Sequence, residues 1–260
     1  MSEGFWRRRG KDARKPAVGL ALLALSAPLT GCDRDRTGSA PAPAGASPET
    51  AGFRFLERHT GGARASDTLP LIVVLHGRGG RPEAVAESLG EFEGKARLIL
   101  PYGPETRKDG FEWYPEAEGF AEGSRRTAER MAALIEEIMK SRPTAGKPIV
   151  MGFSQGAMVA YTLAVLHPRL VRAAFPMSGM LPKPIWPKAW PEGEPKPRIH
   201  ATHGMADEVL PIENDRETVA HLRELGVPIT LTEYPGAVHF VGPKMRRDVA
   251  RALEQVLRER

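Results

Sequence analysis

The sequence has a single cysteine, Cys32, so no disulfide can form within the chain. Aromatic residues make up only 7% of it, and no internal repeat is visible. Its most apolar segment, residues 17–29, is too short to cross a bilayer as a helix of a mature protein. These features exclude a disulfide-stabilised scaffold, a repeat solenoid and a polytopic membrane protein.

Excess positive charge is also missing from most of the chain. The formal net charge is +5, but residues 1–31 alone hold six Lys and Arg against two Asp and Glu. From residue 32 onward, 31 basic residues face 30 acidic ones. Because the charge is balanced after the first 31 residues, the sequence argues against a nucleic-acid partner.

Residues 1–31 have the order of an export signal, in which a cluster of Lys and Arg precedes the apolar segment. The segment ends in Leu29-Thr30-Gly31-Cys32, which resembles the bacterial lipobox. The resemblance implies cleavage before Cys32, lipid attachment to it, and an exported lipoprotein anchored to a membrane in the periplasm or at the cell surface. An ordinary secretory signal with an incidental cysteine is the alternative.

The composition changes twice after this signal. Residues 32–50 are rich in Pro, Ala and Gly and have little apolar surface to bury, which predicts a linker. From Phe53 onward the composition is that of a globular protein, and no second linker interrupts it. We therefore expect residues 51–260 to form one domain.

Short apolar runs in this domain predict β-strands at residues 53–59, 70–76, 97–101, 148–152, 171–177, 198–203 and 228–234. Several runs are apolar at every position, as in parallel strands that are covered on both faces. Helical apolar stripes lie between them, including one that stops before Pro143 and one that begins at Pro243. The alternation predicts an α/β fold with a mostly parallel central sheet and helices on both faces.

The sequence around Ser154 predicts a nucleophile. A buried strand ends at Gly152, a helical pattern starts behind Ser154, and between them lies a G-x-S-x-G motif. Only a sharp turn from strand to helix lifts a serine clear of a sheet, and the glycines at 152 and 156 leave room for the two backbones to cross. The positive end of the helix would then face the reacting centre.

A serine hydroxyl needs a base and a group that orients the base. His239 is our candidate for the base, because it lies in a loop between the last strand and the last helix. Asp207 is our candidate for the acid, because it follows the preceding strand and its turn. We expect His203, in that same turn, to brace it.

An acyl-transfer site also needs N–H donors for the oxyanion. One is the backbone N–H of Gln155, directly after the nucleophile. The other is the backbone N–H of Arg78, in a glycine-rich turn after residues 70–76. This turn lacks the Lys-Ser/Thr of a phosphate-binding P-loop.

Together these segments resemble the phospholipase/carboxylesterase family, which includes the acyl-protein thioesterases. The similarity covers about residues 70–257, and its motifs are Leu75-His76-Gly77, Leu98-Ile99-Leu100-Pro101, Trp113-Tyr114, Gly152-Phe153-Ser154-Gln155-Gly156, His203-Gly204-x-x-Asp207-x-Val209-Leu210-Pro211, Leu225-Gly226-Val227-Pro228 and Tyr234-Pro235-Gly236-x-x-His239. The resemblance implies an alpha/beta-hydrolase fold without a large cap and hydrolysis of carboxylic ester or thioester bonds. It implies no metal and no organic cofactor.

Two regions depart from the family pattern. Arg78 stands where the family usually has leucine, and a guanidinium at the rim of the acyl pocket would disfavour apolar substrates or favour anionic ones. Residues 181–197 hold six prolines, which predicts a stiff irregular loop close to the site. As candidates for the walls of the substrate pocket we take Trp113, Tyr114, Met180, Trp186, Trp190 and Leu210. Simple packing at the surface is the alternative for the two tryptophans of the loop, Trp186 and Trp190.

The sequence thus predicts a serine hydrolase that acts on a small-molecule or acyl ester through an acyl-enzyme. A secreted polyester depolymerase or a feruloyl-type esterase would share the same fold and triad. A lipoprotein that binds a ligand without turnover is the alternative outside the enzymes.

Overall fold

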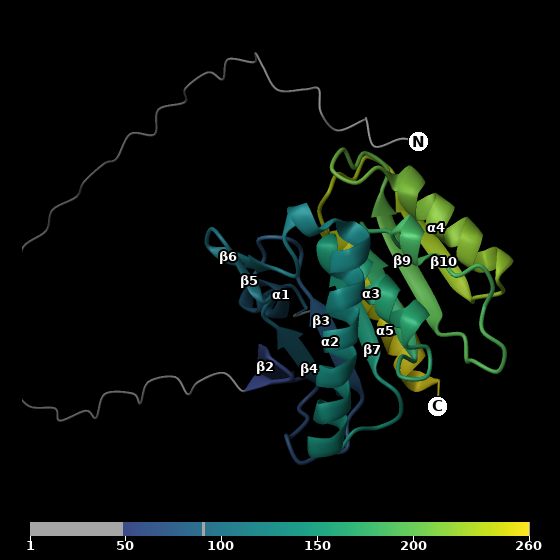
Figure 1. The fold of residues 1–260 in the computed structure, drawn as a ribbon. Coiled ribbons are helices and arrows are strands. Elements are labelled where there is room, and N and C mark those ends of the chain that lie inside the picture. Colours follow the sequence, from purple (N-terminus) through teal and green to yellow (C-terminus); the bar gives the residue numbers. More distant parts are fainter. Residues whose placement is uncertain (1–48, 90–91, 260) are drawn as a thin grey trace, which may run out of the picture. The chain divides into compact units, whose positions relative to one another are not determined.

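The computed structural model describes residues 49–89 and 92–259, which belong to one compact unit. Its centre is an eight-stranded sheet (Figure 1) with the strand order β1-β2-β4-β3-β7-β8-β9-β10. The strands are β1 (Glu49–Thr50), β2 (Phe53–His59), β3 (Leu71–Leu75), β4 (Arg97–Pro101), β7 (Ile149–Phe153), β8 (Ala173–Met177), β9 (Arg198–Gly204) and β10 (Ile229–Tyr234).

The sheet is parallel from β4 to β10, and β1 and β2 are antiparallel to their neighbours at one edge. Because parallel strands all end at the same edge of a sheet, the loops after β3, β7, β9 and β10 lie at one end of the molecule. These are the loops that hold the predicted site residues. The α/β fold with a mostly parallel sheet is therefore confirmed.

Helices cover both faces of the sheet. The core on one face includes residues of α2 (Phe120–Ser141), α3 (Gln155–Leu166) and α4 (Ile212–Glu224). The core on the other face includes residues of α5 (Pro243–Arg258), with α1 (Pro82–Ser88) packed against it. Short 3-10 helices, η1 (Glu116–Glu118) and η2 (Lys183–Ile185), lie in the loops before α2 and after β8.

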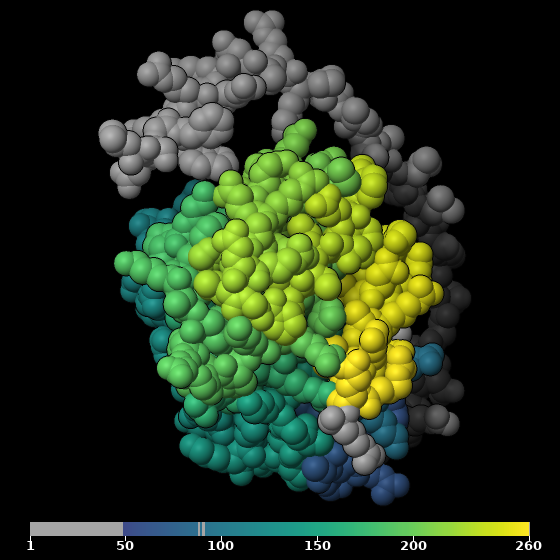
Figure 2. Space-filling view, turned by 90° about the vertical axis from the view of Figure 1, so that its right-hand side faces the viewer, coloured from purple at the N-terminus to yellow at the C-terminus, as the bar shows by residue number. Residues whose placement is uncertain are grey.

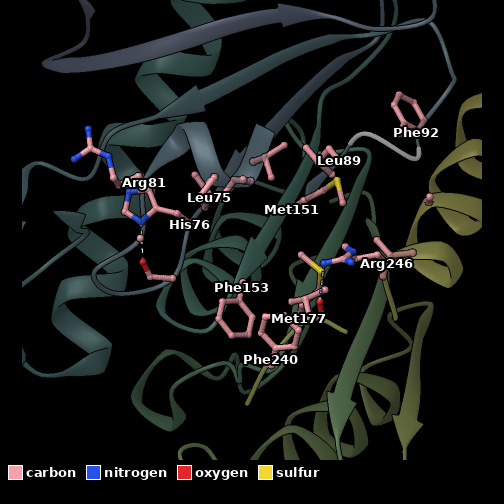
Figure 3. Close-up of a pocket in the computed structure, with 18 of the residues that line it drawn as sticks. Leu75, His76, Arg81, Leu89, Phe92, Met151, Phe153, Met177, Phe240 and Arg246 are labelled. Atoms are coloured by element: carbon pink, nitrogen blue, oxygen red, sulfur yellow. Dashed lines mark hydrogen bonds between the residues drawn. The ribbon is translucent and has the colours of Figure 1, made fainter. Parts of the chain in front are cut away.

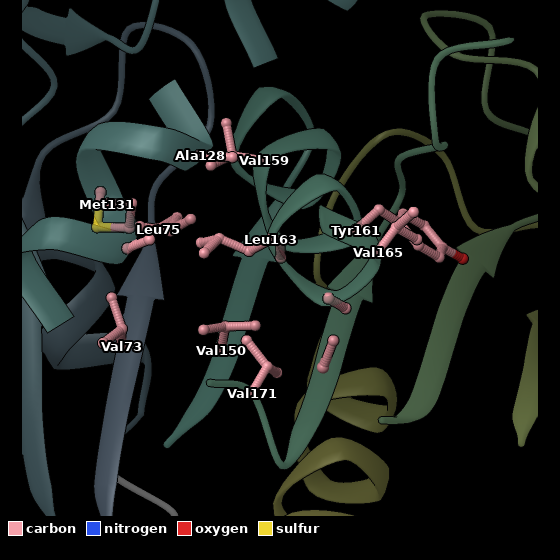
Figure 4. Packing of buried hydrophobic residues seen from close by; sticks show 14 of the residues in the cluster. Val73, Leu75, Ala128, Met131, Val150, Val159, Tyr161, Leu163, Val165 and Val171 are labelled. Carbon is pink, nitrogen blue, oxygen red and sulfur yellow. The ribbon is translucent and has the colours of Figure 1, made fainter. Parts of the chain in front are cut away.

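The alternation of side chains along β3 explains why it is apolar at every position. Val73 and Leu75 point into the core beneath α2 and α3 (Figure 4), and Ile72 and Val74 point into the core beneath α5. All five residues of β3 are buried.

In the space-filling view, the C-terminal half of the chain forms most of the surface that faces the reader, with α5 in yellow (Figure 2).

All seven predicted strands are present. Three short strands and helix α1 were not predicted from the sequence. β1 lies at residues 49–50, inside the range assigned to the linker, and a separate hairpin is formed by β5 (Glu105–Arg107) and β6 (Gly110–Glu112). The predicted signal peptide and residues 32–48 of the linker lie outside the described residues. No helix in the described ranges is both long and apolar enough to cross a membrane.

Candidate active site

Ser154 stands on the turn between β7 and α3, with φ 54° and ψ −118°. L-amino acids rarely adopt such a conformation. A Cβ added to Gly152 would overlap the carbonyl oxygen of Gly156, and a Cβ added to Gly156 would come within 2.6 Å of the Leu75 and His76 carbonyl oxygens. The two glycines are therefore required by the close crossing of strand and helix, for the reason that the sequence suggested.

Three predicted side chains, separated by up to 85 positions in the chain, meet beside this turn. Nε2 of His239 lies 2.8 Å from Oγ of Ser154, and Nδ1 of His239 lies 2.7 Å from Oδ2 of Asp207. Both distances are those of hydrogen bonds. Such a chain can move the hydroxyl proton to the imidazole while the carboxylate stabilises the resulting positive charge.

Asp207 is buried and held by the backbone. Its Oδ1 accepts hydrogen bonds of 2.9 Å from the amides of Val209 and Leu210, which leaves Oδ2 to face His239. The loop of Asp207 is tied to the loop of His239 through the hydrogen bond from Ala206 N to the Ala237 carbonyl. The two side chains are thus positioned by one pair of joined loops.

His239 also has an aromatic neighbour. The ring of Phe153, the residue before the serine, lies 4.9 Å from the imidazole, centroid to centroid. Sequence reasoning did not identify Phe153 as part of the site, because an apolar residue at the end of a buried strand gives no sign of where its ring points. The ring limits the positions that the imidazole can take.

The two predicted oxyanion donors lie beside the serine. Gln155 begins α3, and Arg78 follows Gly77, whose added Cβ would lie 3.4 Å from the Ser154 Cβ. Among residues 49–89 and 92–259, the backbone N–H groups of Arg78 and Gln155 have no protein hydrogen-bond acceptor. Both donors are therefore free to bind a developing oxyanion.

The glycine-rich loop is held by the hairpin that the sequence analysis missed. Gly79 N donates to the Phe111 carbonyl at 2.7 Å, and Phe111 N donates to the Gly80 carbonyl at 3.0 Å. A Cβ on Gly110 would overlap the Gly79 carbonyl, so the hairpin approaches as closely as it does because residue 110 is glycine. The sequence signal for the hairpin is weak, because its two turn residues are Lys108 and Asp109, not the Asp-Gly pair typical of such a turn, and Gly110 already belongs to β6.

His76 fixes the other side of this loop. Its Nε2 accepts a hydrogen bond of 3.0 Å from Gly103 N, so the ring proton is on Nδ1, which donates to the Gly77 carbonyl at 2.8 Å. Burial lowers the pKa of His76 to about 4, against the smaller opposing effect of the Gly77 hydrogen bond. His76 is therefore neutral near pH 7.

The side chain of Gln155 is buried and positions the segment that contains Trp113 and Tyr114. Its amide accepts from Trp113 N at 2.9 Å and donates to the Tyr114 carbonyl at 2.8 Å. The Trp113 indole donates to the His76 carbonyl at 2.7 Å. Trp113 and Tyr114 have no exposed surface, so they support the loops of the site from within the core and form no wall of an open pocket.

The other predicted pocket residues are also used elsewhere. Trp186 stacks on His221 at 4.4 Å and, like Trp190, packs against the core beneath α2, α3 and α4. Leu210 is buried, and its carbonyl accepts from His203; Met180 is half-buried. For Trp186 and Trp190 these contacts favour the packing alternative over a pocket wall.

Arg78 lies beside two carboxylates. Its guanidinium forms ion pairs of 3.4 Å with Glu112 and 3.1 Å with Glu116. These acids lie in the hairpin and in η1, neither of which was predicted to lie beside Arg78. These ion pairs offset part of the positive charge of Arg78, which also lines the cavity beside the site, so the preference for anionic substrates stays a prediction.

A cavity of about 360 Å³ adjoins these loops (Figure 3). It runs between the sheet and helices α1 and α5, and its lining is mostly apolar, with Met151, Phe153, Met177 and Phe240 among its residues. None of the six predicted pocket residues lines it. Phe153 and Phe240 directly neighbour Ser154 and His239 in the chain, so the cavity opens close to the reacting groups.

Apolar side chains also surround the site on the surface. Five large apolar residues of the described ranges are exposed, and four of them flank the two joined loops: Met205, Val209, Val238 and Phe240. An exposed apolar cluster on a folded protein usually marks a surface for apolar ligands or partners. Among the described residues, no group of three or more His, Cys, Asp and Glu could hold a metal ion.

Comparison with known proteins agrees with this architecture. The family model described as phospholipase/carboxylesterase matches residues 63–257. Acyl-protein thioesterase 1 of Debaryomyces hansenii is 27% identical over 148 residues, which cover 56% of this chain and 64% of that relative. The chain thus matches less than two thirds of the length of this relative.

Two solved structures show the same fold at low identity. Esterase PE8 is 22% identical, with a TM-score of 0.68 and coverage of 78% of this chain and 99% of its own. Acyl-protein thioesterase 2 of Zea mays is 22% identical, with a TM-score of 0.61 and coverage of 78% and 99%.

Proposed function

This chain belongs to the phospholipase/carboxylesterase family of hydrolases, and we propose that it cleaves carboxylic esters with Ser154 as nucleophile, His239 as base and Asp207 as the acid. One observation carries the proposal: the unbroken hydrogen-bond chain of 2.8 Å and 2.7 Å that joins the three side chains. A serine on a strained turn, with free amides beside it, is the arrangement that acyl transfer requires.

The reaction proceeds in two halves. Nε2 of His239 takes the proton of Ser154 as Oγ attacks the ester carbonyl, and the amides of Arg78 and Gln155 hold the oxyanion. The C–O bond to the alcohol then breaks, and His239 gives its proton to the leaving alcohol. Water next attacks the acyl-enzyme, His239 takes a proton from it, and the carboxylic acid leaves with Ser154 restored.

The cavity supports a substrate whose acyl group is apolar. Its walls carry few polar groups, and the residues next to Ser154 and His239 form part of them. Each methylene that enters such a pocket contributes about 0.8 kcal/mol of transfer free energy, so chain length would govern activity. A thioester with the same acyl group would pass through the same acyl-enzyme.

Labelling with a fluorophosphonate tests the catalytic proposal. We expect covalent modification of Ser154 in the wild-type protein, none in Ser154→Ala, and a loss of ester turnover of about 10⁴-fold or more in that variant. Ser154→Ala should keep its circular dichroism spectrum. Wild-type protein that remains unlabelled would refute the proposal and favour a lipoprotein that binds without turnover.

A series of p-nitrophenyl esters from acetyl to dodecanoyl tests the acyl site. Ala84 lines the cavity from α1 and is exposed, so Ala84→Trp would fill the space with little cost in folding. We expect this variant to lose activity on long acyl chains and keep it on acetyl, with Ala84→Ser as the matched control. An equal loss on all chain lengths would disprove this acyl site. Lysophospholipids, polyesters and feruloyl esters in the same panel would separate the alternative substrates.

For the N-terminus we propose a lipid anchor at Cys32, supported by the lipobox-like Leu29-Thr30-Gly31-Cys32 sequence. Such an anchor would hold the catalytic domain near a membrane in the periplasm or at the cell surface. Mass spectrometry of the mature protein tests this: an acylated Cys32 at the N-terminus is expected, and an unmodified chain that begins elsewhere would contradict it.

A further inference from the structure

Behind the triad lies a second histidine–aspartate pair. Nδ1 of His203 is 2.9 Å from Oδ2 of Asp215, and Nε2 of His203 is 3.3 Å from Oδ2 of Asp207. All three side chains are fully buried. The same oxygen of Asp207 therefore faces two imidazoles, His239 at 2.7 Å and His203 at 3.3 Å.

The hydrogen-bond partners of His203 fix the number of protons on the pair. Nε2 lies 2.9 Å from the Leu210 carbonyl, which can only accept, so Nε2 carries a proton. Nδ1 lies 2.9 Å from a carboxyl oxygen of Asp215, and without a proton between them the lone pairs of the two atoms would repel each other. A second proton must therefore lie between His203 and Asp215.

Tyr161 decides where this second proton lies. Its hydroxyl donates to Oδ1 of Asp215 at 2.6 Å, a short bond that stabilises the carboxylate. Burial alone lowers the pKa of His203, but the hydrogen bond and charge of Asp215 outweigh it, and the net shift is upward. Burial raises the pKa of Asp215, against the bonds from His203 and Tyr161. The short Tyr161 bond favours an imidazolium at His203.

We propose that His203 is a positioning residue of the site: kept as an imidazolium by Asp215, it orients the Asp207 carboxylate and makes His239 a weaker base. The inference rests on the proposed function of the triad. A positive charge 3.3 Å from Asp207 cancels part of the negative potential that this carboxylate creates at His239. His239 then loses its proton at a lower pH and is available as a base at neutral pH.

Other charged groups near His203 do not supply this effect. Glu233 on β10 is the register partner of His203, but it forms an ion pair of 2.6 Å with Arg216. The remaining ionisable groups that contact His203 in the described chain are Asp207 and Asp215, on the loop after β9 and on α4. The charge on His203 is therefore controlled by Asp215.

The variant Asp215→Asn separates this role from simple bracing. The amide of asparagine can accept from Tyr161 and donate to Nδ1 of His203, which keeps the hydrogen bonds and removes the second proton. We expect the acid limb of the pH profile of kcat/KM, which follows the pKa of His239, to move to higher pH by about one unit, because the positive charge on His203 is lost. Tyr161→Phe should move it in the same direction by less, and serves as a second variant if Asp215→Asn folds poorly.

Glu57→Gln is the matched control. Glu57 forms a partly buried ion pair with Arg97 on β2 and β4, at the other end of the sheet order from β9. We expect it to lower stability and leave the acid limb unchanged. If the acid limb of the pH profile is unchanged in both Asp215→Asn and Tyr161→Phe, His203 has only a structural role and the proposal is overturned.

Nitrogen-15 NMR of the histidine rings, recorded on Ser154→Ala, gives a readout that does not depend on catalysis. We expect both nitrogens of His203 to be protonated near pH 7, and one of them in the Asp215→Asn background. A single ring proton on His203 in the Asp215-containing protein would refute the imidazolium. Failure of the catalytic proposal would instead appear as absent fluorophosphonate labelling with this NMR result unchanged.

Discussion

The site holds two histidine–aspartate pairs, His239–Asp207 and His203–Asp215, and they differ in what the other ring nitrogen of each imidazole contacts. In His239 that nitrogen faces the Ser154 hydroxyl, and the side chain is 16% exposed. In His203 the nitrogen facing Asp207 is also bonded to the Leu210 carbonyl, and the side chain has no exposure. The first imidazole can exchange a proton with a reacting group, whereas the second can only keep one. The same two residue types thus serve chemistry in one place and electrostatic support in the other.

The largest effect is expected when the His239–Asp207 pair is broken and the His203–Asp215 pair is kept. In Asp207→Asn the amide nitrogen would face Nδ1 of His239, so the ring proton would move to the nitrogen that must accept from Ser154. We expect kcat/KM to fall by about 10⁴-fold. The amides of Val209 and Leu210 keep their acceptor, so the urea midpoint should change little. A loss of less than tenfold in steady-state assays would contradict the role of Asp207.

Breaking the second pair should act on stability first. Asp215→Ala leaves the Tyr161 hydroxyl and Nδ1 of His203 without partners in the core. We expect the free energy of unfolding to fall by roughly 3–5 kcal/mol, as for a buried ion pair that loses one partner. Urea denaturation measures this loss. Stability within 1 kcal/mol of wild type, as a rough threshold, would show that the pair contributes little to the fold.

A third histidine of the site, His76, hydrogen-bonds to backbone groups of Gly77 and Gly103 and extends the comparison. Its pKa is lowered to about 4 in the fold by burial, while an unfolded histidine titrates near 6.5. The unfolded state therefore binds more protons between these values, and stability falls as the pH drops from 6.5 toward 4. We expect the loss of stability that His76 causes to reach about 3 kcal/mol at low pH.

The control for this prediction is His76→Gln, which cannot take up the proton. Its unfolding free energy, measured in urea at a series of pH values, should depend less steeply on pH between 6.5 and 4 than that of the wild type. Identical slopes in the two proteins would mean that His76 is not the group responsible.

The smallest expected effect concerns an ion pair at the surface. Because the Arg78 guanidinium is already paired with Glu112 and Glu116, Arg78→Leu should change kcat/KM by less than about fivefold. The loss should be larger for anionic than for neutral esters of equal length, since the oxyanion donor at this position is the backbone N–H and only the side-chain charge is removed. An equal effect on both would discard the preference for anionic substrates.

The sequence was sufficient for the features that depend on local pattern. Residues 71–75 are apolar at each position because both faces of β3 are covered, and this run identified a parallel strand. Gly152 and Gly156 identified the turn at Ser154, because a crossing of two backbones excludes side chains. The order of Ser154, Asp207 and His239 along the chain then followed from the order of the strands.

Only the tertiary structure decided which side chains meet across loops. The approach of Asp215 and Tyr161 to His203 depends on how α3 and α4 pack against the sheet, and no spacing in the sequence encodes it. For the two tryptophans of the proline-rich loop, composition could not decide between a pocket wall and packing, because the direction of a loop cannot be read from composition; the structure packs both against the core. The cavity beneath α1 and α5 likewise arises from the packing of distant helices, since its volume is what those side chains leave unfilled.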